Sequence, residues 1–375
     1  MNLYFLFFFI IFCFFLCLIE RKTYIPHIKW LIIIPFSLIV ANRSTKVPDT
    51  EAYLEFFNAT DPSTFDDFDK FSFEIGFQAF TKIIKFIIDD NFILYFMIIV
   101  LINLIIVNFS INRIGKLFKA DIENNSNFIF VGENRFLKNS NFSVLPLTLY
   151  IAFFGIYTNA IVLRAGFAVS IIIFTSTFAL KSFKSFIDYI AICLLFVIGY
   201  FFHVTILIGI LVILIMSSNK KFTKKTYLYT WFFIGVVYFT NLASNLGDTT
   251  FSLINTINNL TNTVSKISSY EGNVVNEGNG IAAKFIFFWI MAFVLILHSL
   301  QSKIYYKLLN VYLVGLLLFA LFRSVILIER VTDFFLFFSF VIFYFYLITL
   351  RTYKFWLFLF PIIFIQLFFI LRITN

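Results

Sequence analysis

The 375-residue sequence is poor in the side chains that usually mark a metal site or a disulfide framework. It contains three cysteines and three histidines, and only 13% of its residues are charged. Cys13, Cys17 and Cys193 all lie inside apolar runs, so we expect neither a disulfide framework nor a cysteine-based metal site. The first apolar run, residues 1–19, has no basic region before it, and Glu20-Arg21-Lys22 follows it directly. This pattern predicts an uncleaved membrane span rather than a secretory signal.

Hydrophobic residues, in contrast, are abundant along the whole chain. They make up 61% of the sequence, and the mean hydropathy is +0.94. This composition predicts an all-α, polytopic integral membrane protein with about 11–12 transmembrane helices, some short or broken, in a single transmembrane domain. The expected spans are residues 2–19, 28–41, 91–112, 143–163, 165–180, 189–202, 204–217, 227–245, 282–300, 308–327, 332–350 and 355–372.

The distribution of charge predicts the orientation of these spans. With the N-terminus outside, 18 of the 29 basic residues and only five of the 20 acidic residues lie in cytoplasmic loops, as the positive-inside rule requires. The net charge of +9 therefore reflects orientation in a lipid bilayer, and no nucleic-acid partner is expected.

Two long hydrophilic segments, residues 42–90 and 246–281, lie outside in this scheme. In the first, apolar residues recur at helical spacing and predict an amphipathic surface helix over residues 77–88. The residues expected on its apolar face are Phe77, Phe80, Ile84 and Ile87. The second segment contains a Gly/Asn-rich stretch that can serve as a lid.

The stretch from residue 145 to residue 217 contains the most informative interruptions. It holds four apolar runs, each shorter than the roughly 20 residues that usually cross a bilayer. Arg164 and His203 lie at breaks between these runs, and both breaks should open toward the outer side. An ionisable side chain at such a place usually faces a cavity, a partner or a headgroup. The alternatives are a snorkelling arginine and a hydrogen-bonded core histidine.

Seven ionisable residues fall at the outer membrane boundary in this topology. They are Arg43, Asp49, Glu74, Arg164, His203, Arg323 and Arg330. Arginine suits bidentate contacts to phosphate, so several arginines at headgroup level favour a lipid-linked phosphate ligand. Interfacial anchoring is the alternative for Arg323 and Arg330.

The residues leave the identity of the base open. His203 can take a proton, donate to a phosphate oxygen or satisfy a neighbour, and Asp49 or Glu74 can equally be the base. Asp49 has a second interpretation as the cap of a short helix over residues 51–57. The acidic residues 66, 67 and 69 have the oxygen ligands that a divalent cation takes, but we prefer a solvated loop and expect no metal or cofactor.

The order of several short motifs resembles a known family. The motifs are Arg43 followed by Pro48-Asp49-Thr50 and Tyr53, then Glu74-x-Gly76-Phe77, Leu163-Arg164 with Ala168, and Phe202-His203. This order resembles the EpsG branch of bacterial exopolysaccharide polymerases, relatives in role of the Wzy O-antigen polymerases. The resemblance covers residues 40–80 and 145–217, and more faintly 300–345, where Tyr306 and Glu329-Arg330 fit the pattern. Phe334-Phe335 departs from it, because an aromatic hydroxyl would be more usual there.

The resemblance implies a GT-C-like, metal-independent glycosyltransferase. Such an enzyme joins undecaprenyl-pyrophosphate-linked oligosaccharide units at the outer face of the bacterial cytoplasmic membrane, and a flippase and a chain-length regulator are expected as partners. Arg164 would contact the leaving pyrophosphate, with Arg43, Arg323 or Arg330 assisting, and His203, Asp49 or Glu74 would act as the base. A lipid-linked oligosaccharide flippase, an O-antigen ligase and a membrane-bound acyltransferase are the alternatives.

Overall fold

The protein is all-helical throughout the part of the chain that the structure describes. The computed structural model describes residues 3–22, 25, 27–63, 73–123, 144–240, 242, 282–298, 300–323, 328–350, 354, 358–359 and 361–362. These residues form fourteen α-helices and three short π- or 3₁₀-helices, without a strand. They divide into two units, residues 1–217 with 340–375 and residues 218–339. The predicted fold class is confirmed, and each unit is described by itself below.

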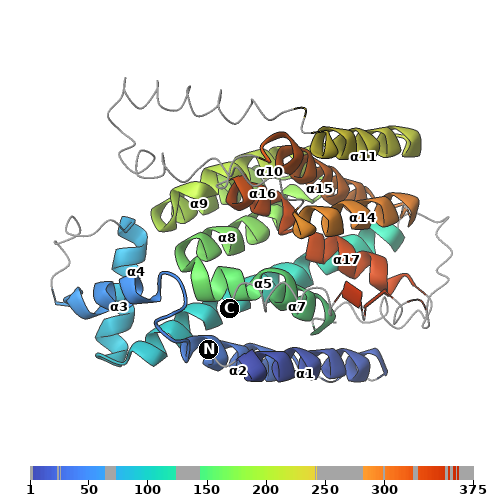
Figure 1. Ribbon diagram of the computed structural model, residues 1–375. Coiled ribbons are helices and arrows are strands. Elements are labelled where there is room, and N and C mark those ends of the chain that lie inside the picture. The colour runs from blue at the N-terminus through green and yellow to red at the C-terminus, as the bar shows by residue number, and fades with distance from the viewer. Residues whose placement is uncertain are drawn as a thin grey trace. The chain divides into compact units, whose positions relative to one another are not determined.

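The first unit contains most of the described helices (Figure 1). They are α1 (Leu3–Lys22), α2 (Trp30–Ala41), α3 (Thr50–Ala59), α4 (Ile75–Ile88), α5 (Phe92–Glu123), α7 (Val144–Tyr150), the π-helices η1 (Ile151–Gly155) and η2 (Tyr157–Ile161), α8 (Leu163–Ala179), α9 (Phe186–Phe202), the 3₁₀-helix η3 (Val204–Leu207), α10 (Ile208–Ser217) and most of α17 (Ser339–Ile348). The 32 residues of α5 extend about 48 Å, enough to cross a hydrocarbon core of about 30 Å. The helices α8 and α9 have 17 residues each, and these short helices agree with the predicted short spans.

The turn between α8 and α9 shows how the sequence ends one short helix and begins the next. Ser185 and Asp188 form a capping box at the start of α9. Lys181 approaches the same carboxylate, with its Nζ 2.5 Å from Asp188 Oδ1. The cap satisfies backbone N–H groups that would otherwise lack partners. This capped turn makes α8 and α9 antiparallel neighbours.

A helix, α4, is present where the sequence predicts a surface helix, but its buried face differs from the predicted one, and its place at a membrane surface stays a prediction. It runs across the ends of α5 and α9 rather than along them (Figure 1). Phe77 and Ile84 are buried as expected, whereas Ile87 is 72% exposed. The buried face is turned toward Lys85, whose Nζ donates to Phe57 O at 2.9 Å and holds α3 against α4. Ile87 instead shares an outer face with the exposed Phe86, and this second apolar face is available to lipid.

The predicted cap by Asp49 is also corrected. The helix α3 begins directly after Asp49, close to its predicted position, but the Asp49 side chain makes no capping hydrogen bond. Its backbone adopts the left-handed region, with φ of 61°, whereas a capping residue usually has an extended backbone. Asp49 is exposed at this turn.

The second unit is a small group of apolar helices. It contains α11 (Lys224–Phe239), α14 (Ala283–His298), α15 (Lys303–Leu321) and α16 (Ile328–Leu336). The rings of Trp231 and Trp289 stack with centroids 4.3 Å apart, and each indole N–H donates to the backbone carbonyl of the other tryptophan. The reciprocal hydrogen bonds satisfy both polar groups and hold α11 against α14.

Several predictions fall outside the described residues. They concern the lid at residues 246–281, the acidic residues 66, 67 and 69, and most of the last span at 355–372. The orientation of the chain across the bilayer also stays a prediction.

Candidate active site

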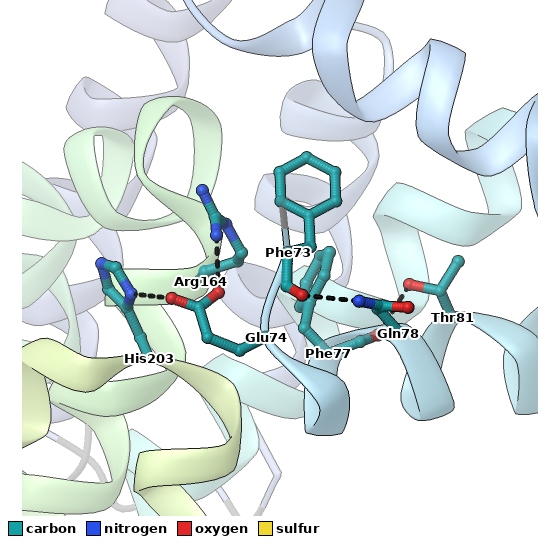
Figure 2. A network of polar contacts seen from close by, with 7 residues as sticks. All are labelled: Phe73, Glu74, Phe77, Gln78, Thr81, Arg164 and His203. Carbon is teal, nitrogen blue, oxygen red and sulfur yellow. Dashed lines mark hydrogen bonds and ion pairs between the residues drawn. The ribbon is translucent and has the colours of Figure 1, made fainter. Parts of the chain in front are cut away.

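Three residues that are distant in the sequence meet at one carboxylate in the first unit. Glu74 lies between Arg164 and His203, as Figure 2 shows. Its Oε2 is 2.5 Å from Arg164 Nη1, and its Oε1 is 2.6 Å from His203 Nδ1. The three side chains are each between 21% and 23% exposed. We call Glu74, Arg164 and His203 the triad.

The break before α8 places Arg164 in the triad. The π-helix η2 ends at Ile161, Val162 leaves helical geometry with φ of −104° and ψ of 60°, and α8 begins at Leu163. Arg164 is therefore the second residue of a new helix. Its guanidinium carbon lies 4.3 Å from the centre of the Phe73 ring, next to the residue that supplies the carboxylate. The predicted break at Arg164 is confirmed.

The end of α9 places His203 opposite Arg164, at the other oxygen of the Glu74 carboxylate. His203 is the C-cap residue of α9 and has an extended backbone, with φ of −165° and ψ of 130°, and η3 begins at the next residue. The predicted break at His203 is therefore also confirmed. Since both breaks contact the same carboxylate, they open toward the same side of the unit.

Glu74 fixes the state of the histidine ring. Burial alone would raise the pKa of Glu74, but the hydrogen bond from His203 and the positive charge of Arg164 outweigh it and hold the pKa at about 2. Glu74 is thus ionised at neutral pH and can only accept hydrogen bonds. His203 Nδ1 must then carry a proton, so Nε2 is the ring nitrogen that can accept one. This geometry makes Glu74 the orienting group and His203 the better base.

The depressed pKa of Glu74 predicts how stability depends on pH. Because the carboxyl has a folded pKa of about 2 against an ordinary 4.5, its ionised form stabilises the folded state above pH 4.5. That contribution, about 3 kcal/mol, should be lost as pH falls from 4.5 toward 2. Thermal unfolding of the purified protein from pH 6 to pH 3 measures this loss of stability. In Glu74→Gln, the part of the pH dependence that comes from Glu74 should be absent. Glu51→Gln, at an exposed position on α3, is the control, and an identical pH dependence in the wild type and Glu74→Gln would contradict the assignment.

Gly76 allows α4 to approach α9 closely enough for Glu74 to reach His203. A Cβ at Gly76 would lie 2.6 Å from the carbonyl oxygen of Phe201 and 2.7 Å from its Cβ. Both distances are shorter than van der Waals contact, and Phe201 is only two residues before His203. The Glu74-x-Gly76-Phe77 motif therefore needs a glycine because α9 leaves no room for a Cβ atom at this position.

Replacing Gly76 by alanine should separate α4 from α9. The added methyl has to displace backbone, which typically costs about 1–3 kcal/mol, and the shift should weaken the hydrogen bond between Glu74 and His203. The melting temperature should fall. Gly115→Ala is the matched control, because nothing lies within 4 Å of a Cβ at that position. Equal behaviour of the two variants would show that the close approach is unimportant.

Arg43 lies beside the triad in a separate environment. Its Nη1 donates to the backbone carbonyls of Asn159 and Ala160, at 3.2 and 2.7 Å. Its guanidinium carbon is 3.5 Å from the centre of the Phe96 ring. Only 8% of Arg43 is exposed, and burial lowers its pKa to about 10, so it remains charged at neutral pH.

The remaining predicted site residues lie elsewhere. Asp49 is exposed at the start of α3, and no ion pair joins it to another described residue. Arg323 belongs to the second unit, where its Nη1 donates to Tyr238 O at 3.0 Å. The backbone of Arg330 lies in α16, but its side chain is outside the described residues. The structure thus brings together Glu74, Arg164 and His203, with Arg43 nearby.

The family of the chain follows from comparison with known proteins. The EpsG family model matches residues 27–375, which include all seven predicted site residues and nearly the whole sequence. The chain belongs to the EpsG family. The predicted resemblance is confirmed, and EpsG proteins are associated with exopolysaccharide biosynthesis. No curated protein and no solved structure matches the chain.

Three residues of this EpsG-family site received no role from the sequence. Tyr53 is only 3% exposed, and the positive charge of Arg164 acts on its hydroxyl. Asn159 is fully buried, and its Nδ2 donates to Gly155 O at 2.7 Å. Phe73 contacts Arg164 through its ring. A lone asparagine inside an apolar run is a signal that could have found Asn159, whereas Phe73 is one of 59 phenylalanines and has no such signal.

The described groups around the triad suit an anion. No group of three or more His, Cys, Asp or Glu side chains among the described residues could hold a metal ion. The donors near the triad are guanidinium groups and a phenol, and these bind anions. The arrangement can therefore orient a base and stabilise negative charge.

Proposed function

We propose that the protein is a polysaccharide polymerase that joins lipid-linked oligosaccharide repeat units. The observation that supports this most is the carboxylate of Glu74, which orients a histidine and holds an arginine at one point. Transfer of a glycosyl group from a lipid pyrophosphate requires a base for the incoming hydroxyl and positive charge for the leaving pyrophosphate. The triad supplies both, and membership of the EpsG family supports exopolysaccharide as the product.

The reaction is a displacement at the anomeric carbon of the growing chain. The hydroxyl oxygen of the acceptor unit forms a bond to that carbon, and its proton passes to His203 Nε2. The bond from the anomeric carbon to the pyrophosphate oxygen breaks, and the pyrophosphate leaves with the electron pair. Arg164 stabilises the charge that develops on the leaving group, an effect that is larger in the transition state than in the ground state. Glu74 keeps the histidine in the required tautomer throughout.

Deletion of the gene, followed by analysis of lipid-linked glycans, distinguishes the candidate activities. A polymerase deletion should leave single repeat units on undecaprenyl pyrophosphate at the outer face of the membrane. Single units confined to the inner face would indicate a flippase. Full-length chains that remain on the lipid would indicate a ligase. Only the first result agrees with the proposal.

The proposed site faces outside only if the predicted orientation is correct. We expect residues 42–90 and 246–281 to be external and residues 220–225 to be cytoplasmic, because the last segment contains four lysines. Single cysteines at Ser44 and at Ser218 can be placed in a variant whose three native cysteines are replaced. An impermeant thiol reagent should label the first in intact cells and the second only after lysis. The reverse pattern would place the triad in the cytoplasm and overturn the proposed mechanism.

A further inference from the structure

The arginine of the triad and the arginine beside it differ in how their charge is neutralised. Arg164 forms an ion pair with the Glu74 carboxylate. Arg43 contacts backbone carbonyls and aromatic rings, and Asp49 acts on it only as a more distant charge, without an ion pair. A buried cation without a carboxylate partner is costly unless another anion compensates it. Arg43 is therefore the guanidinium whose positive charge is available to a ligand.

The hydrogen-bonding groups of Arg43 support the same conclusion. Its Nη1 is used by the carbonyls of Asn159 and Ala160. Its Nε and Nη2 are buried and have no hydrogen-bond partner in the described part of the chain. These two nitrogens form one edge of the planar guanidinium, with parallel N–H groups that match two oxygens of a phosphate. Buried donors are normally satisfied, and leaving each of them unpaired costs about 1–3 kcal/mol.

Tyr53 connects this edge to the triad. Its ring centre lies 6.0 Å from the Arg43 guanidinium carbon, and Arg164 is close enough for its positive charge to oppose the rise in the pKa of Tyr53 that burial causes. The ring is held in place by stacking on Phe73, with centroids 5.6 Å apart, and the Phe73 ring also contacts Arg164. Tyr53 therefore lies close to both arginines, and its O–H group can donate to an anion.

We propose that Arg43 and Tyr53 form a phosphate-binding subsite that holds the substrate's pyrophosphate beside the triad. Binding uses the Nε–Nη2 edge of Arg43 and the O–H group of Tyr53, while the contacts of Nη1 to the backbone keep the guanidinium in position. The identity of the anion as a lipid pyrophosphate rests on the proposed function, whereas the binding of a phosphate group does not. The subsite holds the substrate in the ground state and in the transition state alike, so its loss should raise KM more than it lowers kcat.

Binding of inorganic pyrophosphate to the purified full-length protein in nanodiscs tests the subsite. Arg43→Lys keeps the charge but loses the planar edge, and the dissociation constant should rise about tenfold or more. Tyr53→Phe keeps the stacked ring and loses only the hydroxyl, so a rise of about three- to tenfold is expected. Tyr312→Phe and Arg113→Lys are the matched controls. Tyr312 is a buried tyrosine of the second unit whose hydroxyl donates to Phe288 O, Arg113 is stacked on Phe178, and neither change should alter the affinity.

The outcomes separate this subsite from the proposed function. Unchanged pyrophosphate affinity in Arg43→Lys would overturn the subsite, even if the protein is a polymerase. Affinity that depends on Arg43 in a protein with no polymerase activity would keep the subsite and reject the polymerase. Repeating the measurement with undecaprenyl pyrophosphate in the bilayer shows whether the lipid form binds more tightly than the free anion. If Arg43→Lys does not fold, a cryo-EM structure of the wild type with pyrophosphate decides, and density anywhere other than the Nε–Nη2 edge, or none, overturns the proposal.

Discussion

Replacing Arg164 by alanine or by lysine should abolish polymer chains longer than one repeat unit without loss of protein. The guanidinium contacts Glu74 through Nη1 and stacks on Phe73. An ammonium group is a compact point charge that cannot make these contacts together. Loss of one preorganised donor that stabilises developing charge typically lowers the rate by about 10²–10³. Gel analysis of cell-surface polymer, normalised to the amount of protein in the membrane, measures the effect.

The control for Arg164→Lys should be the same arginine-to-lysine substitution at a position far from the triad. Arg113→Lys meets this condition, because Arg113 also stacks on a phenylalanine ring, with its guanidinium carbon 4.1 Å from the centre of Phe178. Arg113 lies 17 residues after Phe96 along α5, or about 25 Å at the helical rise. We expect normal polymer from this variant. Normal chain length from a well-expressed Arg164→Ala variant would return Arg164 to the role of an interfacial anchor.

The helical breaks were predictable because they follow from hydrophobicity and length alone. A run of apolar residues that is too short to cross the bilayer, ended by an ionisable residue, predicts a turn whatever the neighbours are. Arg164 and His203 lie at such breaks, and counting residues located both. Their meeting at one carboxylate was not predictable in the same way. It depends on α4 crossing the end of α9 at Gly76, a contact between residues that are more than 100 positions apart.

The sequence also left open which residue of the site is the base, because it does not show which side chains are in contact. Glu74, Asp49 and His203 are all chemically able to act as a base, and sequence order does not reveal their partners. The structure separates them by environment. The hydrogen bond from His203 and the charge of Arg164 lower the pKa of Glu74, and Asp49 is exposed, which leaves His203 as the better candidate for the base. The apolar face of α4 was misassigned at Ile87 because Thr81 and Lys85, which are polar, occupy the buried side through their hydrogen bonds.

His203 is the residue whose replacement best distinguishes proton transfer from simple hydrogen bonding. His203→Ala removes both the base and the partner of Glu74, so polymer formation should fall by about 10²–10⁴. Glutamine keeps an N–H donor that can reach the Glu74 carboxylate, but it cannot accept a proton at neutral pH. If His203 is the base, His203→Gln should lose as much activity as His203→Ala while remaining folded. If the ring only donates a hydrogen bond, glutamine should retain most of the activity.

The measurement is initial rate against a synthetic lipid-linked repeat unit, together with the melting temperature of each variant. His298→Gln in the second unit, at the C-terminal end of α14, is the matched control and should leave the rate unchanged. A large loss of rate in His203→Gln with an unchanged melting temperature assigns proton transfer to Nε2. A rate close to that of the wild type would mean that His203 serves only to hold Glu74. The base would then have to be sought among groups that the triad positions, because Glu74 itself, with a pKa of about 2, is too weak a base to take a proton from a sugar hydroxyl at neutral pH.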